Sequence, residues 1–251
     1  MVHFVGAGCG AADLITLRGM KLIENADTLI YAGSLVNPEL LEFARKDCRI
    51  LNSAEMTLDE VIAAMVSTHS SGGDTVRLHT GDPSIYGAIR EQMDRLDELG
   101  IGYDVCPGVS SFCGAAAALR AEYTLPDVSQ TVILTRMAGR TPVPGKEQIR
   151  LLAAHQATMV IFLSTGMLRD LSAELIAGGY SPDTPAAIVY KASWKDEKVC
   201  RCTVAELAQT AEANNISKTA LITVGGFLGD SYSLSKLYDP SFETGFRRAI
   251  E

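Results

Sequence analysis

The stretch Arg77-Leu-His-Thr-Gly-Asp-Pro-Ser-Ile-Tyr-Gly87 contains the residues of this sequence best suited to holding a small ligand. Gly81 permits a close backbone approach or a positive φ, and the proline after Asp82 favours a turn. Asp82 places a carboxylate at the carboxyl end of a predicted strand, where open α/β sheets bind their ligands. The same residues would also form an ordinary turn in which Asp82 or Ser84 caps a helix predicted to run from Ser84 to Leu99. The stretch alone does not separate these two interpretations.

A second glycine-rich turn, Gly6-Ala-Gly-Cys-Gly10, follows a predicted strand at 2–5. It departs from a dinucleotide-binding fingerprint because Ala11 stands where the third glycine belongs, and Tyr31 ends the next strand where an acidic residue is required. An NAD(P)-linked oxidoreductase is therefore kept as an alternative. The segment 139–146 is excluded as a phosphate-binding loop, because its spacing is one residue too long and Glu147 replaces the required Ser or Thr.

No metal site is expected from the cysteines and histidines. Cys200 and Cys202 would share one face of a strand, but neither a histidine nor a second cysteine pair accompanies them. The four histidines are scattered, including His79 beside the Gly-Asp-Pro turn. Because no nucleophile and base can be paired by spacing, no catalytic residue is assigned.

Composition places the chain among ordinary globular proteins, with 47% hydrophobic and 21% charged residues. The net charge of −8 argues against a nucleic-acid partner, and no apolar run approaches the ~18 residues of a membrane span. The first residues, Met-Val-His-Phe-Val-Gly, enter a strand directly and do not resemble a signal peptide. We expect a cytoplasmic protein that binds neither nucleic acid nor membrane.

Short apolar runs alternate with helical patterns in the first half, which predicts a parallel sheet with strands at 2–5, 28–31, 49–51, 74–78 and 103–106. Thr57-Leu-Asp-Glu60 is a capping-box sequence. Polar residues around Pro126 interrupt the alternation, so we predict a domain at 1–121, a linker at 122–130 and a second domain at 131–251. Strands in the second domain are predicted at 131–135, 158–163, 186–190, 198–203 and 219–224, with a charged hairpin turn near 195–197.

Several separated stretches together resemble one family. They are Val5-Gly-Ala-Gly-Cys-Gly10 with Asp13-Leu-Ile-Thr16, the Arg77–Pro83 stretch, Pro107-Gly-Val-Ser-Ser111, and the apolar strands 158–163 and 185–190. The set is similar to the tetrapyrrole methyltransferases, S-adenosylmethionine enzymes of cobalamin and sirohaem synthesis, from residue 2 to about 228. Cys9 stands where the family usually has Pro, and Ala11-Ala12 where it often has Asp-Pro. Within the family, Tyr31–Val36 and Thr135–Pro142 most resemble the precorrin-4 C-11-methyltransferases, in oxygen-dependent or cobalt-first form.

The resemblance implies an α/β protein of two αβα domains, the first with a mostly parallel sheet and the second with a mixed one, and an active cleft between them. It also implies a homodimer. S-adenosylmethionine would contact Thr80, Gly81, Asp82, Ile85, Ser110, Ser111, Leu163, Ser164, Ala192, Thr219 and Ala220. The carboxylate-rich tetrapyrrole would lie against Tyr31, Ser34, Arg136 and Arg140. Methylation at another ring position (C-2/C-7, C-17 or C-20) and a non-catalytic binding module remain alternatives.

Overall fold

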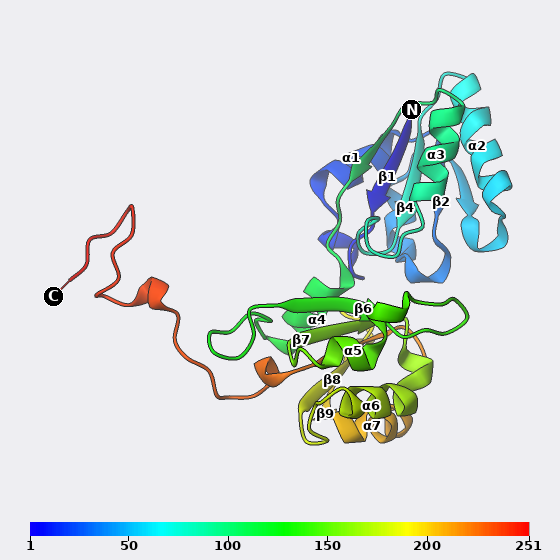
Figure 1. Cartoon of the computed structure of the whole chain (residues 1–251). Coiled ribbons are helices and arrows are strands. Elements are labelled where there is room, and N and C mark those ends of the chain that lie inside the picture. The colour runs from blue at the N-terminus through cyan, green and yellow to red at the C-terminus, as the bar shows by residue number, and fades with distance from the viewer. Residues whose placement is uncertain (251) are drawn as a thin grey trace. The chain divides into compact units, whose positions relative to one another are not determined.

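The computed structural model describes residues 1–250, with the side chain of Ser34 outside the described part. The chain divides into two compact units (Figure 1). Unit 1 comprises residues 1–115 and 191–197, and unit 2 comprises 116–190 and the residues from 198 onward. The division falls inside a helix and leaves 122–130 within unit 2, so independent domains at 1–121 and 131–251 stay a prediction.

Unit 1 is built on a five-stranded, wholly parallel sheet of order β3-β2-β4-β1-β5. Its strands are β1 (Val2–Gly6), β2 (Thr28–Tyr31), β3 (Arg49–Asn52), β4 (Thr75–His79) and β5 (Tyr103–Cys106). β4 is buried throughout, as expected for a central strand covered on both faces. The parallel sheet predicted from the alternation of strands and helices is confirmed.

Helices cover both faces of this sheet. Successive strand residues point to opposite sides, so apolar side chains emerge on each face and pack under a helix. On one face Val5 and Leu29 pack with Ile23 of α1, and on the other Phe4 and Ile30 pack with residues of α2 and α3. The α-helices are α1 (Leu17–Asn25), α2 (Leu58–Ser70), α3 (Arg90–Glu98) and α4 (Ser111–Leu119), the last shared with unit 2; short 3₁₀ turns are η1 (Ala12–Leu14), η2 (Gly33–Leu35), η3 (Pro38–Phe43) and η4 (Ser53–Glu55). The predicted capping box at Thr57 and Glu60 is confirmed.

The helix predicted to begin at Ser84 is wrong over its first turns, since α3 begins only at Arg90. One oxygen of Asp82 accepts both the amide and the hydroxyl of Ser84, which closes a local turn instead of capping a helix. Tyr86 and Ala88 then adopt φ values of 57° and 50°, outside the helical region.

Unit 2 contains a mixed sheet of order β6-β7-β10-β8-β9, in which only β6 and β7 are parallel. The strands are β6 (Val132–Arg136), β7 (Thr158–Phe162), β8 (Pro185–Tyr190), β9 (Lys198–Thr203) and β10 (Ala220–Val224). β8 and β9 pair antiparallel, so the predicted hairpin is confirmed. Its connection, 191–197, belongs to unit 1.

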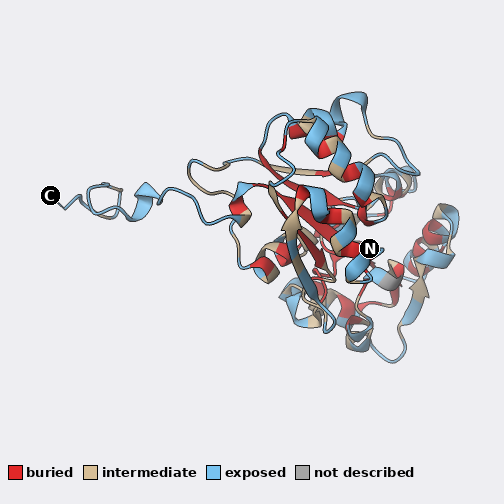
Figure 2. Ribbon diagram, turned by 90° about the horizontal axis from the view of Figure 1, so that it is seen from below, coloured by how far each residue is buried: buried red, intermediate tan, exposed pale blue. Residues whose placement is uncertain are grey.

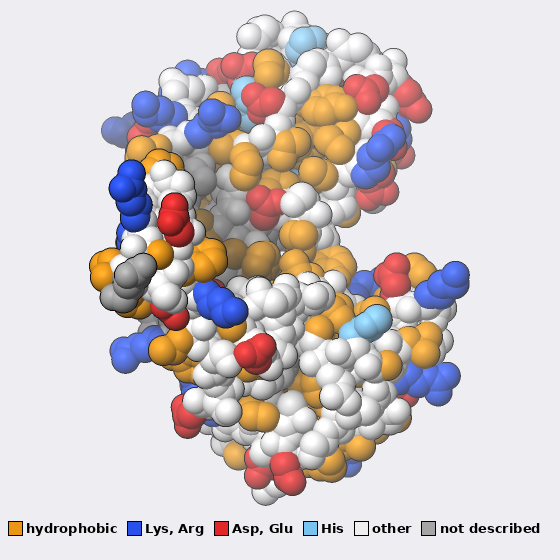
Figure 3. Space-filling view, turned by 60° about the vertical axis from the view of Figure 1, so that its left-hand side comes forward, with side chains coloured by type: hydrophobic (Ala, Val, Ile, Leu, Met, Phe, Trp, Pro, Cys, Tyr) orange, Lys and Arg blue, Asp and Glu red, His pale blue; other side chains and the backbone are white. Residues whose placement is uncertain are grey.

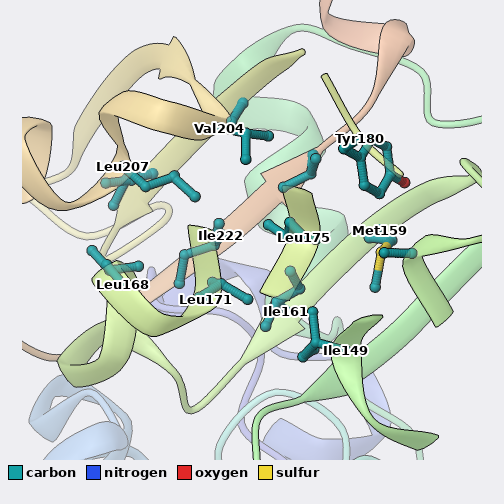
Figure 4. Packing of buried hydrophobic residues seen from close by; sticks show 14 of the residues in the cluster. Ile149, Met159, Ile161, Leu168, Leu171, Leu175, Tyr180, Val204, Leu207 and Ile222 are labelled. Atoms are coloured by element: carbon teal, nitrogen blue, oxygen red, sulfur yellow. The ribbon is translucent and has the colours of Figure 1, made fainter. Parts of the chain in front are cut away.

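The helices of unit 2 pack one apolar face against its sheet (Figure 4). Leu168, Leu171 and Leu175 recur on one side of α6 and meet Ile161 and Ile222 of the sheet. The helices are α5 (Ile149–Ala153), α6 (Leu168–Ala177) and α7 (Leu207–Ala213), each preceded by a 3₁₀ turn. The 3₁₀ turns are η5 (Gly145–Glu147), η6 (Thr165–Met167), η7 (Val204–Glu206), η8 (Gly226–Leu228) and η9 (Lys236–Tyr238).

Burial is concentrated in the strands and the helix faces that cover them, whereas residues 229–250 form a largely exposed tail (Figure 2). The tail exposes Tyr232, Leu234, Leu237, Tyr238, Phe242, Phe246 and Ile250. In the part of the chain that the structure describes, no helix is long and apolar enough to cross a membrane.

Candidate functional site

Three turns meet at the carboxyl ends of the adjacent strands β4, β1 and β5, and glycines allow their close approach. Gly8 and Gly81 exchange backbone hydrogen bonds, the Gly81 amide donating at 2.8 Å and the Gly8 amide at 3.3 Å. A Cβ on Gly108 would lie 2.2 Å from the Gly81 carbonyl oxygen, and one on Gly6 would lie 2.5 Å from the Gly108 Cα. The turns therefore form a single compact backbone surface that a larger residue at either position would disrupt.

Asp82 joins two of these turns through its carboxylate. One oxygen accepts the Ser84 amide at 2.8 Å and the Ser84 hydroxyl at 2.5 Å, while the other accepts the Gly108 amide at 2.9 Å. Partial burial would raise the pKa of Asp82, but the hydrogen bonds from Ser84 and Gly108 hold it below its ordinary value. Asp82 is thus ionised, and both of its carboxylate oxygens accept hydrogen bonds that shape the turn.

The residues around this turn fit a ligand that carries hydrogen-bonding and charged groups. The hydroxyl oxygen of Thr80 is buried and has no hydrogen-bond partner among the described residues, so a bound group would satisfy it. Gly81, at φ 64°, lies against the start of α4, where a Cβ would be 3.4 Å from the Ser110 Cα and the Ser111 nitrogen. The first turn of a helix offers free amides to a carboxylate. Ile85 follows on the partly exposed side of the same turn.

In unit 2, strained residues stand at the end of β7 and just before β10. Leu163 has a φ of 53° and is 66% exposed, and the β-branched Thr219 has a φ of 58°. The two antiparallel strands place these residues at the same end of the sheet, and the Thr165 hydroxyl donates to the Ala220 carbonyl at 3.0 Å. Non-glycine residues held at positive φ are concentrated at binding sites in proteins. An exposed Leu163 on such a backbone offers an apolar surface to a flat ring.

Ser164 has a different environment from the one expected of a ligand contact. Its side chain is fully buried, and its hydroxyl donates to the Phe162 carbonyl at 2.7 Å and accepts the Met137 amide at 2.9 Å. The hydroxyl therefore joins the end of β7 to the loop after β6, and only backbone atoms of Ser164 remain for a ligand.

Arg136 likewise uses its guanidinium within unit 2. It donates to the carbonyls of Met137 and Thr141 at 3.1 Å and of Pro142 at 2.7 Å. Arg140, on the loop that these bonds hold, is exposed. The two arginines that the sequence placed together thus differ: Arg136 shapes the loop and Arg140 presents a charge.

The segment 191–197 packs on the Gly6–Gly10 turn and contains residues that sequence reasoning did not single out. A Cβ on Gly10 would lie 2.3 Å from Cδ1 of Trp194, and the Ala11 amide donates to the Ser193 hydroxyl at 3.0 Å. A cavity of about 580 Å³ lies beside this contact, lined by Ala11, Ala12, Asp13, Asn37, Glu39, Phe43, Ser193, Trp194, Lys195 and Asp196. Trp194 is the single tryptophan of the chain, the one signal that could have marked it.

The structure shows the surroundings of two further predicted site residues, Ala192 and Tyr31. Ala192 is buried in this segment, with its carbonyl oxygen 2.5 Å from where a Gly10 Cβ would stand. Tyr31, half-buried, ends β2, and the predicted contact through the Ser34 side chain lies outside the described residues. Among residues 1–250, no three His, Cys, Asp or Glu side chains form a group that could hold a metal ion, and Cys200 and Cys202 pack against the core of unit 2.

Comparison with known proteins gives a consistent result. A family model described as Tetrapyrrole (Corrin/Porphyrin) Methylases matches residues 1–208. The chain is 54% identical to a cobalt-precorrin-4 C(11)-methyltransferase of Methanocaldococcus jannaschii, covering 99% of this chain and 96% of the relative, and 45% identical to a precorrin-4 C(11)-methyltransferase of a Sinorhizobium species, covering 98% of each.

Among solved structures, a cobalamin biosynthetic enzyme described as cobalt precorrin-4 methyltransferase matches with a TM-score of 0.89 and 44% identity, covering 91% of this chain and 96% of that chain. A uroporphyrin-III C-methyl transferase from Thermus thermophilus shares the fold, with a TM-score of 0.75 at 23% identity, covering 90% and 92%. The expected fold of two αβα units is thereby confirmed. By its sequence match and its fold, the chain belongs to the tetrapyrrole (corrin/porphyrin) methylase family.

Proposed function

We propose that this protein transfers a methyl group from S-adenosylmethionine to C-11 of precorrin-4, or of its cobalt complex, in cobalamin biosynthesis. The observation that carries the proposal is the match along nearly the whole chain, at 54% and 45% identity, to enzymes named for this reaction. The family assignment disfavours the NAD(P)-linked alternative, in line with the defective dinucleotide fingerprint at Ala11.

S-adenosylmethionine, when bound, supplies an electrophilic methyl group on a sulfonium, so positioning can provide most of the catalysis. In unit 1 we assign its binding to the backbone of Gly81, the buried hydroxyl of Thr80 and the α4 start at Ser110 and Ser111. Asp82 holds these groups in place through Gly108. From unit 2 we assign Leu163 as an apolar contact, with backbone groups of Ser164, Thr219 and Ala220, and we retain Ile85 and Ala192 as further contacts.

The tetrapyrrole carries carboxylate side chains, which an exposed cation can bind. We assign this role to Arg140, on the loop that Arg136 holds through three carbonyls. Tyr31 and Ser34 are retained as substrate contacts. On the face shown in Figure 3, acidic and basic side chains are interspersed, which suits local recognition of a few carboxylates better than binding of a long polyanion.

We also propose that the protein acts in the cytoplasm as a homodimer. Its six cysteines are free, which fits a reducing compartment. The exposed apolar side chains of residues 229–250 offer surface for a second copy. Light scattering coupled to size-exclusion chromatography measures the molecular mass, and a monomer at micromolar concentration would remove the dimer from the proposal.

The deciding experiment supplies precorrin-4 and cobalt-precorrin-4 in parallel, each with isotopically labelled S-adenosylmethionine. We expect one labelled methyl group per product, located at C-11 by NMR, and the faster substrate identifies the form used. Label that appears only with an earlier intermediate would shift the assignment to another ring position. Absence of methylation of any tetrapyrrole, together with retained cofactor binding, would favour a binding module.

A further inference from the structure

Arg77 places a positive charge inside the sheet of unit 1. It lies on the central strand β4, and the residue is only 7% exposed. No carboxylate of the described chain lies within salt-bridge distance of its guanidinium, which instead donates to neutral oxygens. Burial lowers the pKa of Arg77 to about 10, so the group stays charged at neutral pH.

Burying a charge without a counter-ion carries a desolvation penalty that an apolar residue at the same core position would avoid. Well-packed apolar residues often replace buried ionic groups with no loss of stability. The guanidinium of Arg77 donates to a backbone carbonyl on one side and to a side-chain oxygen on the other. Nη1 donates to the Ile30 carbonyl at 3.2 Å, directly before Tyr31, and Nε donates to Oε1 of Gln92 at 3.1 Å.

Gln92 extends this contact to the segment 84–89, which follows the Gly81-Asp82-Pro83 turn. Gln92 is 5% exposed, and its side-chain amide donates to the Ala88 carbonyl at 2.9 Å. Ala88 and Tyr86 both have positive φ, and a Cβ on Gly87 would lie 2.1 Å from the Pro83 carbonyl oxygen. Backbone of this kind is strained and persists only where surrounding contacts hold it. The Arg77–Gln92 pair is one such contact.

The pair is separate from the contacts that hold the neighbouring turn. Asp82 and Gly108, with the Gly8 and Gly81 amides, fix that turn without Arg77 or Gln92. Beyond the turn, the segment leaves Tyr86 47% exposed. Loss of the Arg77–Gln92 pair is therefore expected to disturb the Tyr31 and Tyr86 positions while leaving the turn intact.

We propose that Arg77 is a positioning residue for the tetrapyrrole: through the Ile30 carbonyl and through Gln92 it fixes Tyr31 and the strained Tyr86 segment as contacts for the substrate macrocycle. This inference rests on the proposed function, because it requires that the tetrapyrrole be the second substrate. Tyr86 is then a substrate contact that the sequence did not reveal, because the helix expected from Ser84 would have given Tyr86 a helical backbone and another side-chain direction.

The test uses Gln92→Glu and Gln92→Met in the full chain, with Tyr86→Ala. Gln92→Glu keeps an acceptor for Arg77 but replaces the donor to Ala88 with an oxygen, whereas Gln92→Met removes both contacts. We expect KM for the tetrapyrrole to rise about tenfold in all three, as for one lost hydrogen bond or contact. Affinity for S-adenosylhomocysteine, measured by calorimetry, should stay within about twofold.

Thr68→Val serves as the matched control, because it breaks a buried hydrogen bond between Thr28 and Thr68 (2.7 Å) in the same unit. It should lower stability without changing KM. A merely structural role for Gln92 would give the same pattern as this control. Unchanged tetrapyrrole KM in both Gln92 variants, or a parallel loss of S-adenosylhomocysteine affinity, would overturn the proposal.

Hydrogen exchange separates this inference from the proposed function. Amides of 84–90 should exchange faster in both Gln92 variants and at the wild-type rate in Thr68→Val. If the wild-type protein methylates no tetrapyrrole, the proposed function fails, and with it the substrate role of Tyr86. If the wild type is active but exchange at 84–90 does not change, the positioning role alone fails.

Discussion

Replacing Asp82 tests how the turn between β4 and α3 is held. Asp82→Ala removes three hydrogen bonds, two from Ser84 and one from the Gly108 amide. Hydrogen bonds to a charged group contribute about 1.5–3 kcal/mol each when buried. Ser84 is exposed and recovers water, and the carboxylate itself is partly solvated, so most of the loss comes from the half-buried Gly108 amide.

We therefore expect the free energy of unfolding to fall by about 2–3 kcal/mol in Asp82→Ala, with the chain still folded at 25 °C. Asp82→Asn keeps one acceptor oxygen and should lose about half as much. Affinity for S-adenosylmethionine should fall in both variants, because the Gly81 backbone and the α4 start are no longer held together. Denaturant unfolding and calorimetry measure the two effects.

The pH dependence follows from the lowered pKa of Asp82. A carboxyl group whose folded pKa is depressed stabilises the fold above its unfolded pKa of about 3.9 and loses that contribution as the pH falls through the folded pKa. The stability difference between wild type and Asp82→Ala should be full at pH 7 and shrink below about pH 4. A difference under about 0.5 kcal/mol at pH 7, or one that persists undiminished in acid, would refute the reasoning.

Three further predictions concern other parts of the site. Gly108→Ala brings a Cβ to 2.2 Å from the Gly81 carbonyl, so we expect a loss of about 1–3 kcal/mol and of S-adenosylhomocysteine binding, whereas Gly102→Ala, with open space around it, should change neither in the same assays. Leu163→Gly relieves the strain of the positive φ, so thermal unfolding should show unchanged or higher stability. Calorimetry should show weaker S-adenosylhomocysteine binding, because the exposed apolar side chain is lost. A fall in both stability and affinity would contradict the role of Leu163 as a strained ligand contact. Arg140→Ala should raise the KM for the tetrapyrrole without altering stability. Arg136→Ala should raise the same KM and also increase proteolysis of loop 137–142, because three carbonyls of that loop lose their donor. An equal effect of either variant on cofactor affinity would argue against a substrate role.

Much of the fold could be predicted because its signals are local. The strands of both sheets are short apolar runs, such as Thr28–Tyr31 and Thr158–Phe162, and their boundaries were predicted to within one residue. The Thr57 capping box is encoded in four consecutive residues. The turns at Gly6 and Gly81 are visible in the sequence as glycines, which tolerate the close backbone contact found at Gly6 and the positive φ found at Gly81.

The failures arise where side chains compete with regular structure or meet distant partners. The helix expected from Ser84 was lost to the Asp82 carboxylate, which bonds Ser84 locally and Gly108 at long range. Nothing in the sequence shows that Arg136 satisfies carbonyls of its own loop, or that the Ser164 hydroxyl is buried against Met137. These contacts depend on the completed fold.

The segment 191–197 has a consequence for how the protein folds. The chain passes between the units at 115–116, 190–191 and 197–198, so unit 1 is completed by residues made after most of unit 2. Trp194 and Ser193 fill the space beside Gly10 and Ala11, and both residues are made only after β8. During synthesis unit 1 therefore cannot complete its folding until much of unit 2 has been made, although domains usually fold from the N-terminus as independent units. Such late, long-range closure slows folding, and cutting the gene at 122–130 would produce an N-terminal fragment without its Trp194 contact.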